Sequence, residues 1–548
     1  KVIWNHATQT WTAVSELGHA KGKTKSQKIA KLTAVAGAVI SSVAISQGAQ
    51  AATSLNELAG YGIELRNSKL VITPNARPGN SATDNSIVVG YQNTASGDGD
   101  GKTIYGANNT VSSDAGVAVG NNNIVRGGAS VGIGTTTQAL GEATVAIGNV
   151  AQATQIRATA VGNRATATQD SASAFGNRAN ATAQFATAIG DNTNAGAAAV
   201  AVGTHANATA QDSVAVGNNS NGSGINSIAI GKDTVASKDH ALAMTTGAQA
   251  TGVQTIAIGT NTVASNEASI AIGKTANSTG SAAIAFGSDS VSSNDNTIAV
   301  GKSSKATDNN SLAVGTQANT SGRNGVGIGA YTEATGNRAT SVGALTQASG
   351  DGSFAGGASA KATGTNSVAI GGATDGTLAK KEGTAAKAVG NNSIALGTNS
   401  TATGNNSIAQ GISAVAQQTA DIAIGANAAA NGTDTPAGSS TGETAGTAIS
   451  IGANSVATGI ATTALGEAAK ATQNGAVAVG SKANATNKAA AAFGRDANAS
   501  GESSTALGSG AKASGQYSFA GSVNANASGT QAIAIGRNAN ASAEYAVA

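Results

Sequence analysis

Residues 391–411 read NNSIALGTNSTATGNNSIAQG, and this stretch states one phrase twice. The phrase NNSIA begins at Asn391 and again at Asn405, and Gly397 and Gly411 follow it at the same step of 14 residues. The step continues along most of the chain and gives about 31 repeats, and a glycine, here called the marker glycine, closes all of them except those that end at Thr245 and Ser522. A period this regular predicts a solenoid, in which one small structural unit stacks on the next.

Two short strands are expected in each repeat. Branched apolar residues stand three and one residues before the marker glycine, with alanine between them, and this alternation predicts a strand. Small residues at the third and fifth positions after the glycine indicate a second strand, and Asn, Asp, Gly and Ser suit the junctions. The branched residues are therefore the predicted core of the repeat: Ile228, Ile230, Ile256, Ile258, Val368, Ile370, Ile394, Ile533 and Ile535.

The composition supports a thin, layered β-structure. The 548 residues are 40% hydrophobic but only 3% aromatic, with 74 glycines, 3 prolines and no cysteine. A disulfide framework is therefore excluded, and alanine, valine and isoleucine must supply the packing. The formal net charge is +3, and six lysines lie in residues 1–51, so the remainder is nearly neutral and offers no basic surface for nucleic acid.

Residues 1–51 have the pattern of a helical, cleaved signal peptide. The basic stretch GKTKSQKIAK at 22–31 precedes an apolar run at 32–45, and Ala49 and Ala51 form an Ala-x-Ala cleavage site. The additional residues before the basic stretch resemble the extended signal peptide region of large exported surface proteins of Gram-negative bacteria. This resemblance implies export to the cell surface.

The repeat pattern is interrupted twice and defines the expected segments. A lead-in is expected after the signal peptide, followed by three blocks of repeats separated by two insertion loops that leave the repeat at a corner. The last block stops within a repeat, so a stalk and a membrane anchor are expected further downstream. The expected boundaries are 52–80 for the lead-in, 81–371, 386–431 and 445–548 for the repeats, and 372–385 and 432–444 for the insertions.

A single copy of this repeat buries little apolar surface. Half of the inward-facing surface of the repeat is alanine and serine, which bury little apolar area. Fixing the backbone of fourteen residues, in contrast, costs considerable conformational entropy. The sequence therefore predicts an obligate oligomer in which several chains share their apolar surfaces.

The phrases NSIAIG (Asn226–Gly231), NSVAIG (Asn366–Gly371) and NSIALG (Asn392–Gly397) resemble the head repeats of YadA-like trimeric autotransporter adhesins. The resemblance implies an all-β, left-handed parallel β-roll that forms a homotrimer at the bacterial outer membrane. It also implies attachment to host matrix, host cells, surfaces or other bacteria. The candidate contacts are polar residues of the turns: Asn226, Ser227, Asn366, Ser367, Asn392 and Ser393.

Catalysis is not expected. His205 and His240 are isolated in separate repeats, and GDGDGK at 97–102 lacks the later ligands and the distal glutamate of a calcium loop. We therefore predict no enzyme, cofactor or metal site. A spacer that presents a distal binding tip is the alternative function. A solenoid polysaccharide lyase would require an aromatic-lined groove, and an ice-binding solenoid would require a regular threonine ladder.

Overall fold

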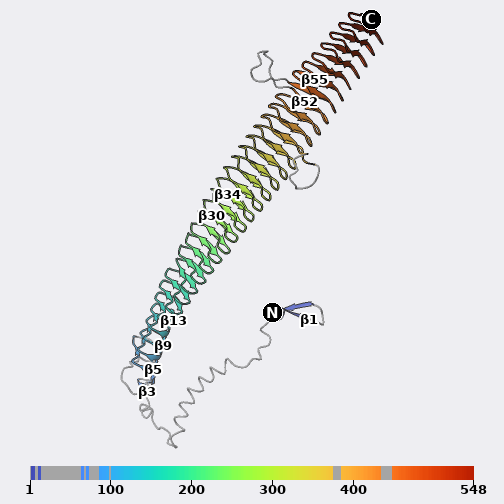
Figure 1. The fold of residues 1–548 in the computed structure, drawn as a ribbon. Helices are drawn as coiled ribbons and strands as arrows, with labels where there is room; N and C mark the ends of the chain where they lie inside the picture. The colour runs from blue at the N-terminus through green and yellow to red at the C-terminus, as the bar shows by residue number, and fades with distance from the viewer. Residues whose placement is uncertain are drawn as a thin grey trace, which may run out of the picture. The chain divides into compact units, whose positions relative to one another are not determined.

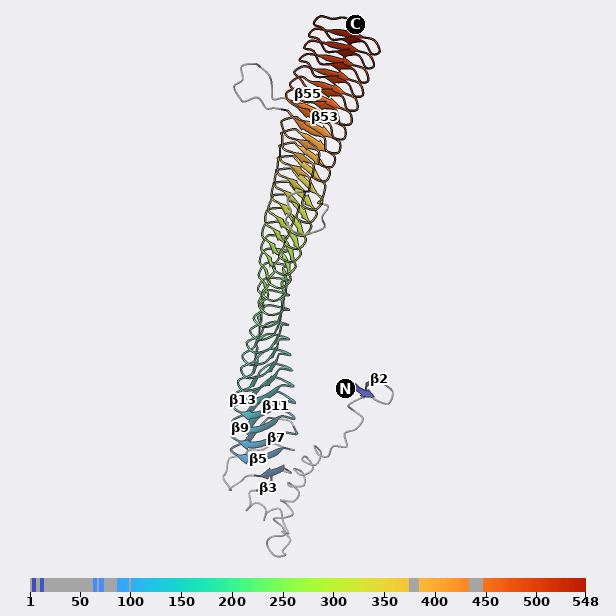
Figure 2. The same cartoon turned by 45° about the vertical axis from the view of Figure 1, so that its right-hand side comes forward.

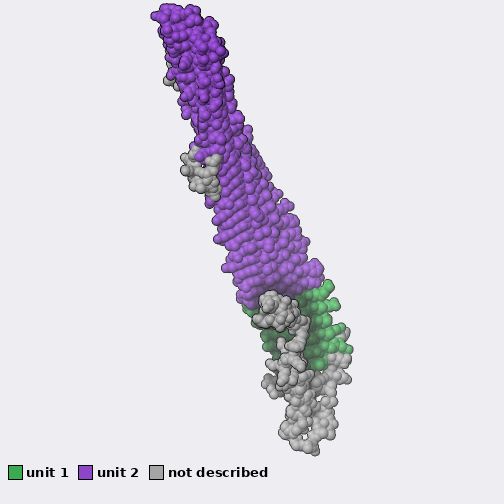
Figure 3. Space-filling view, turned by 90° about the vertical axis from the view of Figure 1, so that its right-hand side faces the viewer, with its two compact units in different colours: residues 1–168 green, residues 169–548 purple. Residues whose placement is uncertain are grey.

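All regular secondary structure that the structure describes is β-strand (Figure 1). The chain forms two compact units, residues 1–168 and 169–548 (Figure 3). No helix long and apolar enough to cross a membrane occurs among the described residues. The computed structural model describes residues 2–5, 10–13, 63–66, 69–72, 86–97, 100–373, 384–432 and 447–548.

The first described residues are strands, although the sequence predicted a helical signal segment. β1 (Val2–Asn5) and β2 (Thr10–Ala13) pair in antiparallel orientation. The helical prediction is therefore wrong for these eight residues. The apolar run and the predicted cleavage residues Ala49 and Ala51 lie outside the described residues.

Unit 1 begins its repeats from a hairpin. β3 (Ile63–Arg66) and β4 (Lys69–Ile72) are antiparallel, and β4 then pairs in parallel with β5 (Ile87–Tyr91). From β5 onward the odd-numbered and the even-numbered strands form two parallel ladders. The further strands of unit 1 are β6 (Thr94–Ala95), β7 (Thr103–Ala107), β8 (Thr110–Val111), β9 (Val117–Asn121), β10 (Ile124–Val125), β11 (Val131–Thr135), β12 (Gln138–Ala139), β13 (Val145–Asn149), β14 (Gln152–Ala153), β15 (Thr159–Val161) and β16 (Thr166–Ala167).

The interior of unit 1 contains larger side chains than alanine. Val88 and Ile104 are completely buried. A buried amide ladder runs beside them, in which Asn109 Nδ2 donates to Asn93 Oδ1 at 3.0 Å. Because buried amides are costly unless they are hydrogen-bonded, this ladder holds successive repeats in one register.

Unit 2 repeats a simpler element. Residues 218–231 contain β24 (Asn221–Gly222), a turn, β25 (Ile228–Ile230) and the marker glycine. Successive strands of each parity pair in parallel, with partners such as Ile228 and Leu242 one repeat apart (Figure 2). The predicted parallel solenoid with two strands in each 14-residue repeat is confirmed.

The odd-numbered strands of unit 2 form its first sheet. They are β17 (Ser173–Phe175), β19 (Thr187–Ile189), β21 (Val200–Val202), β23 (Val214–Val216), β25, β27 (Leu242–Met244), β29 (Ile256–Ile258), β31 (Ile270–Ile272), β33 (Ile284–Phe286), β35 (Ile298–Val300), β37 (Leu312–Val314), β39 (Val326–Ile328), β41 (Thr340–Val342), β43 (Phe354–Gly356), β45 (Val368–Ile370), β47 (Ile394–Leu396), β49 (Ile408–Gln410), β51 (Ile422–Ile424), β53 (Ala448–Ile451), β55 (Thr462–Leu465), β57 (Val477–Val479), β59 (Ala491–Phe493), β61 (Thr505–Leu507), β63 (Phe519–Gly521) and β65 (Ile533–Ile535).

The even-numbered strands form the second sheet. They are β18 (Asn180–Ala181), β20 (Asn194–Ala195), β22 (Asn207–Ala208), β24, β26 (Val235–Ala236), β28 (Gln249–Ala250), β30 (Val263–Ala264), β32 (Asn277–Ser278), β34 (Val291–Ser292), β36 (Lys305–Ala306), β38 (Asn319–Thr320), β40 (Glu333–Ala334), β42 (Gln347–Ala348), β44 (Lys361–Ala362), β46 (Lys387–Ala388), β48 (Thr401–Ala402), β50 (Val415–Ala416), β52 (Ala429–Asn431), β54 (Val456–Thr458), β56 (Lys470–Ala471), β58 (Asn484–Ala485), β60 (Asn498–Ala499), β62 (Lys512–Ala513), β64 (Asn526–Ala527) and β66 (Asn540–Ala541).

The interior of unit 2 is built from alanine and hydroxyl residues, not from the branched residues. Ala229 lies at the centre of β25 and is completely buried, whereas its neighbours Ile228 and Ile230 are 36% and 37% exposed. The predicted core is therefore wrong for the single chain, because so narrow a coil encloses only small side chains. The other predicted core residues are likewise partly or largely exposed: Ile256, Ile258, Val368, Ile370, Ile394, Ile533 and Ile535.

Both insertions leave the ladder and return in phase. Ile370 pairs with Leu396 across the first insertion, and Ile424 pairs with Ile451 across the second. Residues 374–383 and 433–446, which make up most of the two predicted loops, lie outside the described residues.

Candidate assembly face and exposed ladders

The outer face of the first sheet of unit 2 carries two columns of apolar side chains, which we call the apolar stripe. In each three-residue odd-numbered strand these are the first and last residues; in β53 and β55 they are the last residue and the residue two before it. Their exposure is substantial: Phe286 is 51% exposed, Leu507 is 49% exposed and Ile370 is 45% exposed. Soluble proteins rarely leave so long a contiguous apolar surface uncovered, so the stripe marks an interaction face.

The two stripe residues of one strand compensate each other in size. Where the last residue is glycine, as at Gly356 and Gly521, the first is phenylalanine. An added Cβ at Gly356 would lie 3.0 Å from the Phe354 ring, and one at Gly521 would lie 2.6 Å from the Phe519 ring. Each ring thus occupies the place of its missing neighbour. This compensation is typical of a face that packs against a constant surface.

The outer face of the second sheet of unit 2, which we call the polar face, is mainly polar, although it also carries Val235, Val263, Val291, Val415, Ala429 and Val456. Asn180 donates to Asn194 Oδ1 at 3.2 Å, and Asn484 donates to Asn498 Oδ1 in the same way. Each of these bonds joins two successive repeats. These amide ladders satisfy one another along the sheet and leave further polar groups for water. The two sheets of unit 2 therefore present chemically different outer faces.

The turns place one half of the predicted contact residues outside and the other half inside. Asn226, Asn366 and Asn392 are exposed in left-handed backbone, with φ of 56°, 53° and 55°. Asparagine tolerates this conformation better than most residues. Asn392 also donates to Asn406 Oδ1 at 3.1 Å, so equivalent turns of successive repeats are joined by an amide bond of their own.

The serines that follow these asparagines are not available as contacts. Ser227, Ser367 and Ser393 are completely buried and point toward the interior. Their prediction as ligand contacts is therefore wrong, because each serine stands two residues before the buried alanine of the following strand, and alternate residues of an extended segment share a face.

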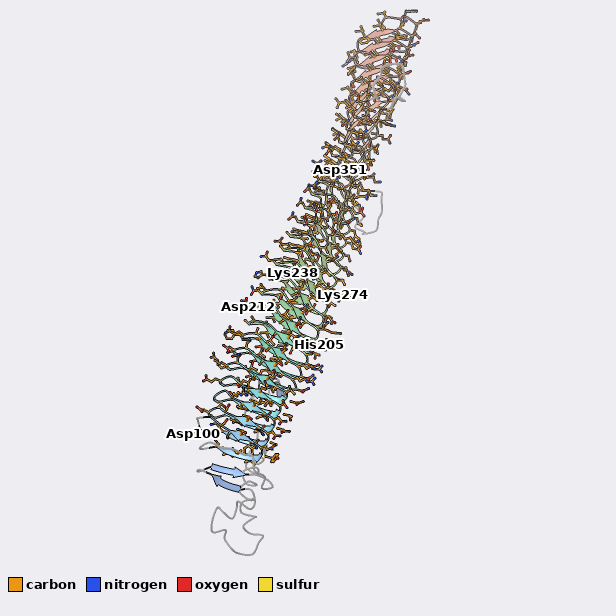
Figure 4. The ribbon with its side chains drawn as sticks, turned by 90° about the vertical axis from the view of Figure 1, so that its left-hand side faces the viewer. Asp100, His205, Asp212, Lys238, Lys274 and Asp351 are labelled. Carbon is orange, nitrogen blue, oxygen red and sulfur yellow. The ribbon has the colours of Figure 1, made fainter. Side chains whose placement is uncertain are left out.

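Charged side chains are distributed rather than gathered. Figure 4 shows Asp212, Lys238, Lys274, His205 and Asp351 projecting outward from four repeats of unit 2, with His205 and Asp212 in one of them. No group of three residues suited to hold a metal ion occurs among the described residues.

The histidines and one notable acid confirm this dispersed pattern. His205 and His240 are exposed at corners of separate repeats. Hydrogen bonds from Thr275 and Ser288 lower the pKa of Asp289, which is fully exposed. These contacts organise the turn, and the charges of Lys274 and Lys302 lower the same pKa to a smaller extent.

The GDGDGK stretch contributes a buried lysine. Lys102 is 1% exposed, and its Nζ donates to the carbonyl oxygen of Gly97 at 3.3 Å. Residues 98–99 lie outside the described residues. The lysine occupies the position four before the marker glycine, which serine or threonine takes in most repeats.

Asp421 is a buried acid that sequence reasoning missed. It occupies the same position four before the marker and is completely buried. Its carboxylate accepts the N–H groups of Gln418 at 2.9 Å, Gly432 at 3.1 Å and Ala448 at 2.8 Å. Gly432 and Ala448 flank the second insertion, so one side chain joins both ends of it.

Burial raises the pKa of Asp421, against the opposing effect of the backbone N–H groups of Ala448, Gln418 and Gly432. Because its folded pKa lies above the unfolded value, its contribution to stability is greatest below about pH 4 and falls as the pH rises through the folded pKa. The only sequence signal was an aspartate where most other repeats carry serine, threonine or alanine.

Asp421→Asn is expected to lower the free energy of unfolding at pH 7 by about 1–3 kcal/mol, because the amide nitrogen faces a backbone donor. Thermal unfolding between pH 7 and pH 4 should show the deficit widening toward acid, since only the wild-type side chain can take up a proton. Ser407→Ala, at the same position one repeat earlier, should give no such divergence. Parallel pH profiles of wild type and Asp421→Asn would contradict the role of burial.

Comparison with protein families gives one match for the N-terminal segment and another for the repeats. Residues 1–45 match the extended signal peptide of the type V secretion system, which indicates that the chain is exported. The search of curated proteins found no relative that matches. The YadA head domain repeat matches residues 84–99, 127–193, 195–220, 223–244, 246–332, 334–374, 383–400, 402–428, 457–483, 485–520 and 527–548. These matches cover more than half of the sequence, and the chain therefore belongs to the family of trimeric autotransporter adhesins with YadA-type heads.

Proposed function

We propose that this chain forms the head of a homotrimeric adhesin on the bacterial surface and acts by multivalent attachment, without catalysis. Three left-handed β-rolls pack through their apolar stripes, which buries the side chains that a single chain leaves exposed. The observation that carries the proposal is this stripe, with residues such as Ile230, Ile370 and Leu507 at 37–49% exposure. Burial of that area in the trimer supplies the stabilisation that the alanine interior lacks.

The polar faces and corners then point outward in three copies. Candidate contacts are the exposed turn residues Asn226, Asn366 and Asn392, together with the two insertions. Each contact is weak, but repetition along the chain and threefold symmetry raise the overall affinity through effective concentration. Host matrix, host cells, inert surfaces and other bacteria are the proposed targets, and the head is proposed to be held at the outer membrane.

The proposed segments are those expected from the sequence. Residues 1–51 are a cleaved signal peptide and residues 52–80 a lead-in. Residues 81–548 form the head with its two insertions.

The repeats themselves, rather than a distal tip, are proposed to bind. Deleting residues 204–287 removes six whole repeats and joins Gly203 to Ser288 in phase. Bacteria that display this variant at the wild-type surface level should adhere to a panel of purified matrix proteins at least about a fifth less well, since about a fifth of the repeats are removed. Unchanged adhesion would contradict binding by the repeats and favour the spacer function.

A further inference from the structure

One position of the apolar stripe carries an amide. Gln410 ends β49, where most other odd-numbered strands of unit 2 carry isoleucine, valine or leucine. Its partners on the neighbouring strands are Leu396 and Ile424. The side chain is exposed on the apolar face, next to the completely buried Ala409.

The amide is exceptional within the stripe. Among the described repeats between residues 173 and 535, all other stripe residues are aliphatic, aromatic, methionine, glycine or short hydroxyl side chains. The hydroxyl residues always occupy the first column and are Ser173, Thr187, Thr340, Thr463 and Thr505. A hydroxyl can bond to nearby backbone, whereas the longer amide of glutamine projects beyond its own strand.

Covering the stripe imposes a requirement on this amide. A primary amide moved from water into an apolar contact is unfavourable unless a polar partner meets it. Along the stripe, the levels next to Gln410 offer only Leu396 and Ile424. In a trimer whose chains lie level with one another, the nearest polar group is the Gln410 amide of each sister chain.

We propose that Gln410 forms a polar layer that fixes the axial register of the assembled chains; this rests on the proposed trimer. A displacement of one chain by one repeat leaves most of the stripe equally well packed, because Ile256, Ile270 and Ile284 are interchangeable. The same displacement sets Gln410 against leucine or isoleucine and leaves its amide without a partner. Buried polar residues select register in coiled coils by the same physics.

The chain lacks cysteine, so single labels can report the register directly. Lys232 and Lys302 are exposed at equivalent corners five repeats apart. Differently tagged chains that carry Lys232→Cys or Lys302→Cys are mixed, refolded, purified by both tags and spin-labelled. An axial slip of one repeat changes the axial offset between labels on different chains by about 5 Å, and pulsed electron paramagnetic resonance detects the resulting change in the distance between them.

With Gln410 present, one distance is expected between the two kinds of chain. Gln410→Ile should add shifted distances in at least about a tenth of the molecules, and Gln410→Asn should restore a single distance. Gln249→Ile is the matched control, because Gln249 lies between Val235 and Val263 on the polar face of the second sheet. The Gln249→Ile control should keep a single distance between the labels of the two kinds of chain.

The outcomes separate the two proposals. A single unshifted distance in Gln410→Ile would overturn the register role while leaving the trimer intact. Dissociation of Gln410→Ile would also overturn it, since Gln410 would then supply assembly rather than register. Sedimentation of the wild-type chain as a monomer would instead overturn the proposed function on which the inference rests.

Discussion

Replacement of Ile256 and Ile284 by aspartate is expected to abolish association of the chain, whereas aspartate at Val235 and Val263 should leave it associated. Ile256 and Ile284 begin β29 and β33 on the apolar stripe, two repeats apart. Val235 and Val263 begin β26 and β30 on the polar face, with the same spacing. The two variants therefore introduce equal charge and equal loss of β-propensity on opposite faces.

The expected difference is large because the stripe is covered in the proposed trimer. An ion moved from water into an apolar contact without a partner costs several kcal/mol. Even about 1 kcal/mol at each of about six sites in a trimer would weaken association by roughly four orders of magnitude, since each 1.4 kcal/mol is tenfold. Sedimentation velocity at micromolar concentration provides the measurement. Equal sedimentation of the two variants would exclude the stripe as the assembly face.

The repeat and its strands were predictable because the sequence states them locally. Alternation around Ala229 or Ala257 identifies a strand, and the marker glycine identifies its end. Polar turn residues such as Asn226 complete the repeat. These signals depend on backbone conformation within a few residues. Because the same signals recur in every 14-residue repeat, the pattern cannot arise by chance.

The inside of the coil was not predictable from the same alternation. A period of two places Ile228 and Ile230 on one face and Ala229 on the other, but it does not say which face is enclosed. The width of the coil decides this, and that width follows from turns that bring short strands close together. The recurrence of the smallest side chain at the middle position, as at Ala229 and Ala257, was the available signal.

The same ambiguity affected the candidate contacts. Asn392 and Ser393 are both polar and adjacent, so hydrophilicity alone could not separate the exposed residue from the buried one. Asp421 shows the limit more clearly, since its partners Gly432 and Ala448 come together only when the repeat closes across the second insertion. No local pattern reveals such a contact between segments.

A second large effect is expected at the marker glycines. Valine at Gly273, Gly287 and Gly301 together should unfold the central part of unit 2. Their φ angles are 133°, 136° and 131°, in a region that residues with side chains rarely adopt. A Cβ at Gly273 would lie 2.4 Å from the carbonyl oxygen of Gly287, and a Cβ at Gly287 would lie 2.4 Å from that of Gly301. Backbone strain alone costs about 1–3 kcal/mol at each site.

Thermal unfolding followed by circular dichroism should show the melting temperature of the triple variant lowered by at least about 10 °C, or a separate early transition, because each repeat contacts only its neighbours. Gly128→Ala is the control, since its φ is not positive and a Cβ there meets nothing within 4 Å. Thr245 and Ser522 occupy the marker position naturally, with φ of 83° and 139°, so a single replacement by a small residue should be tolerated better than three valines. A triple variant that melts with the wild type would show that stacking of the marker backbones does not set the spacing of the repeats.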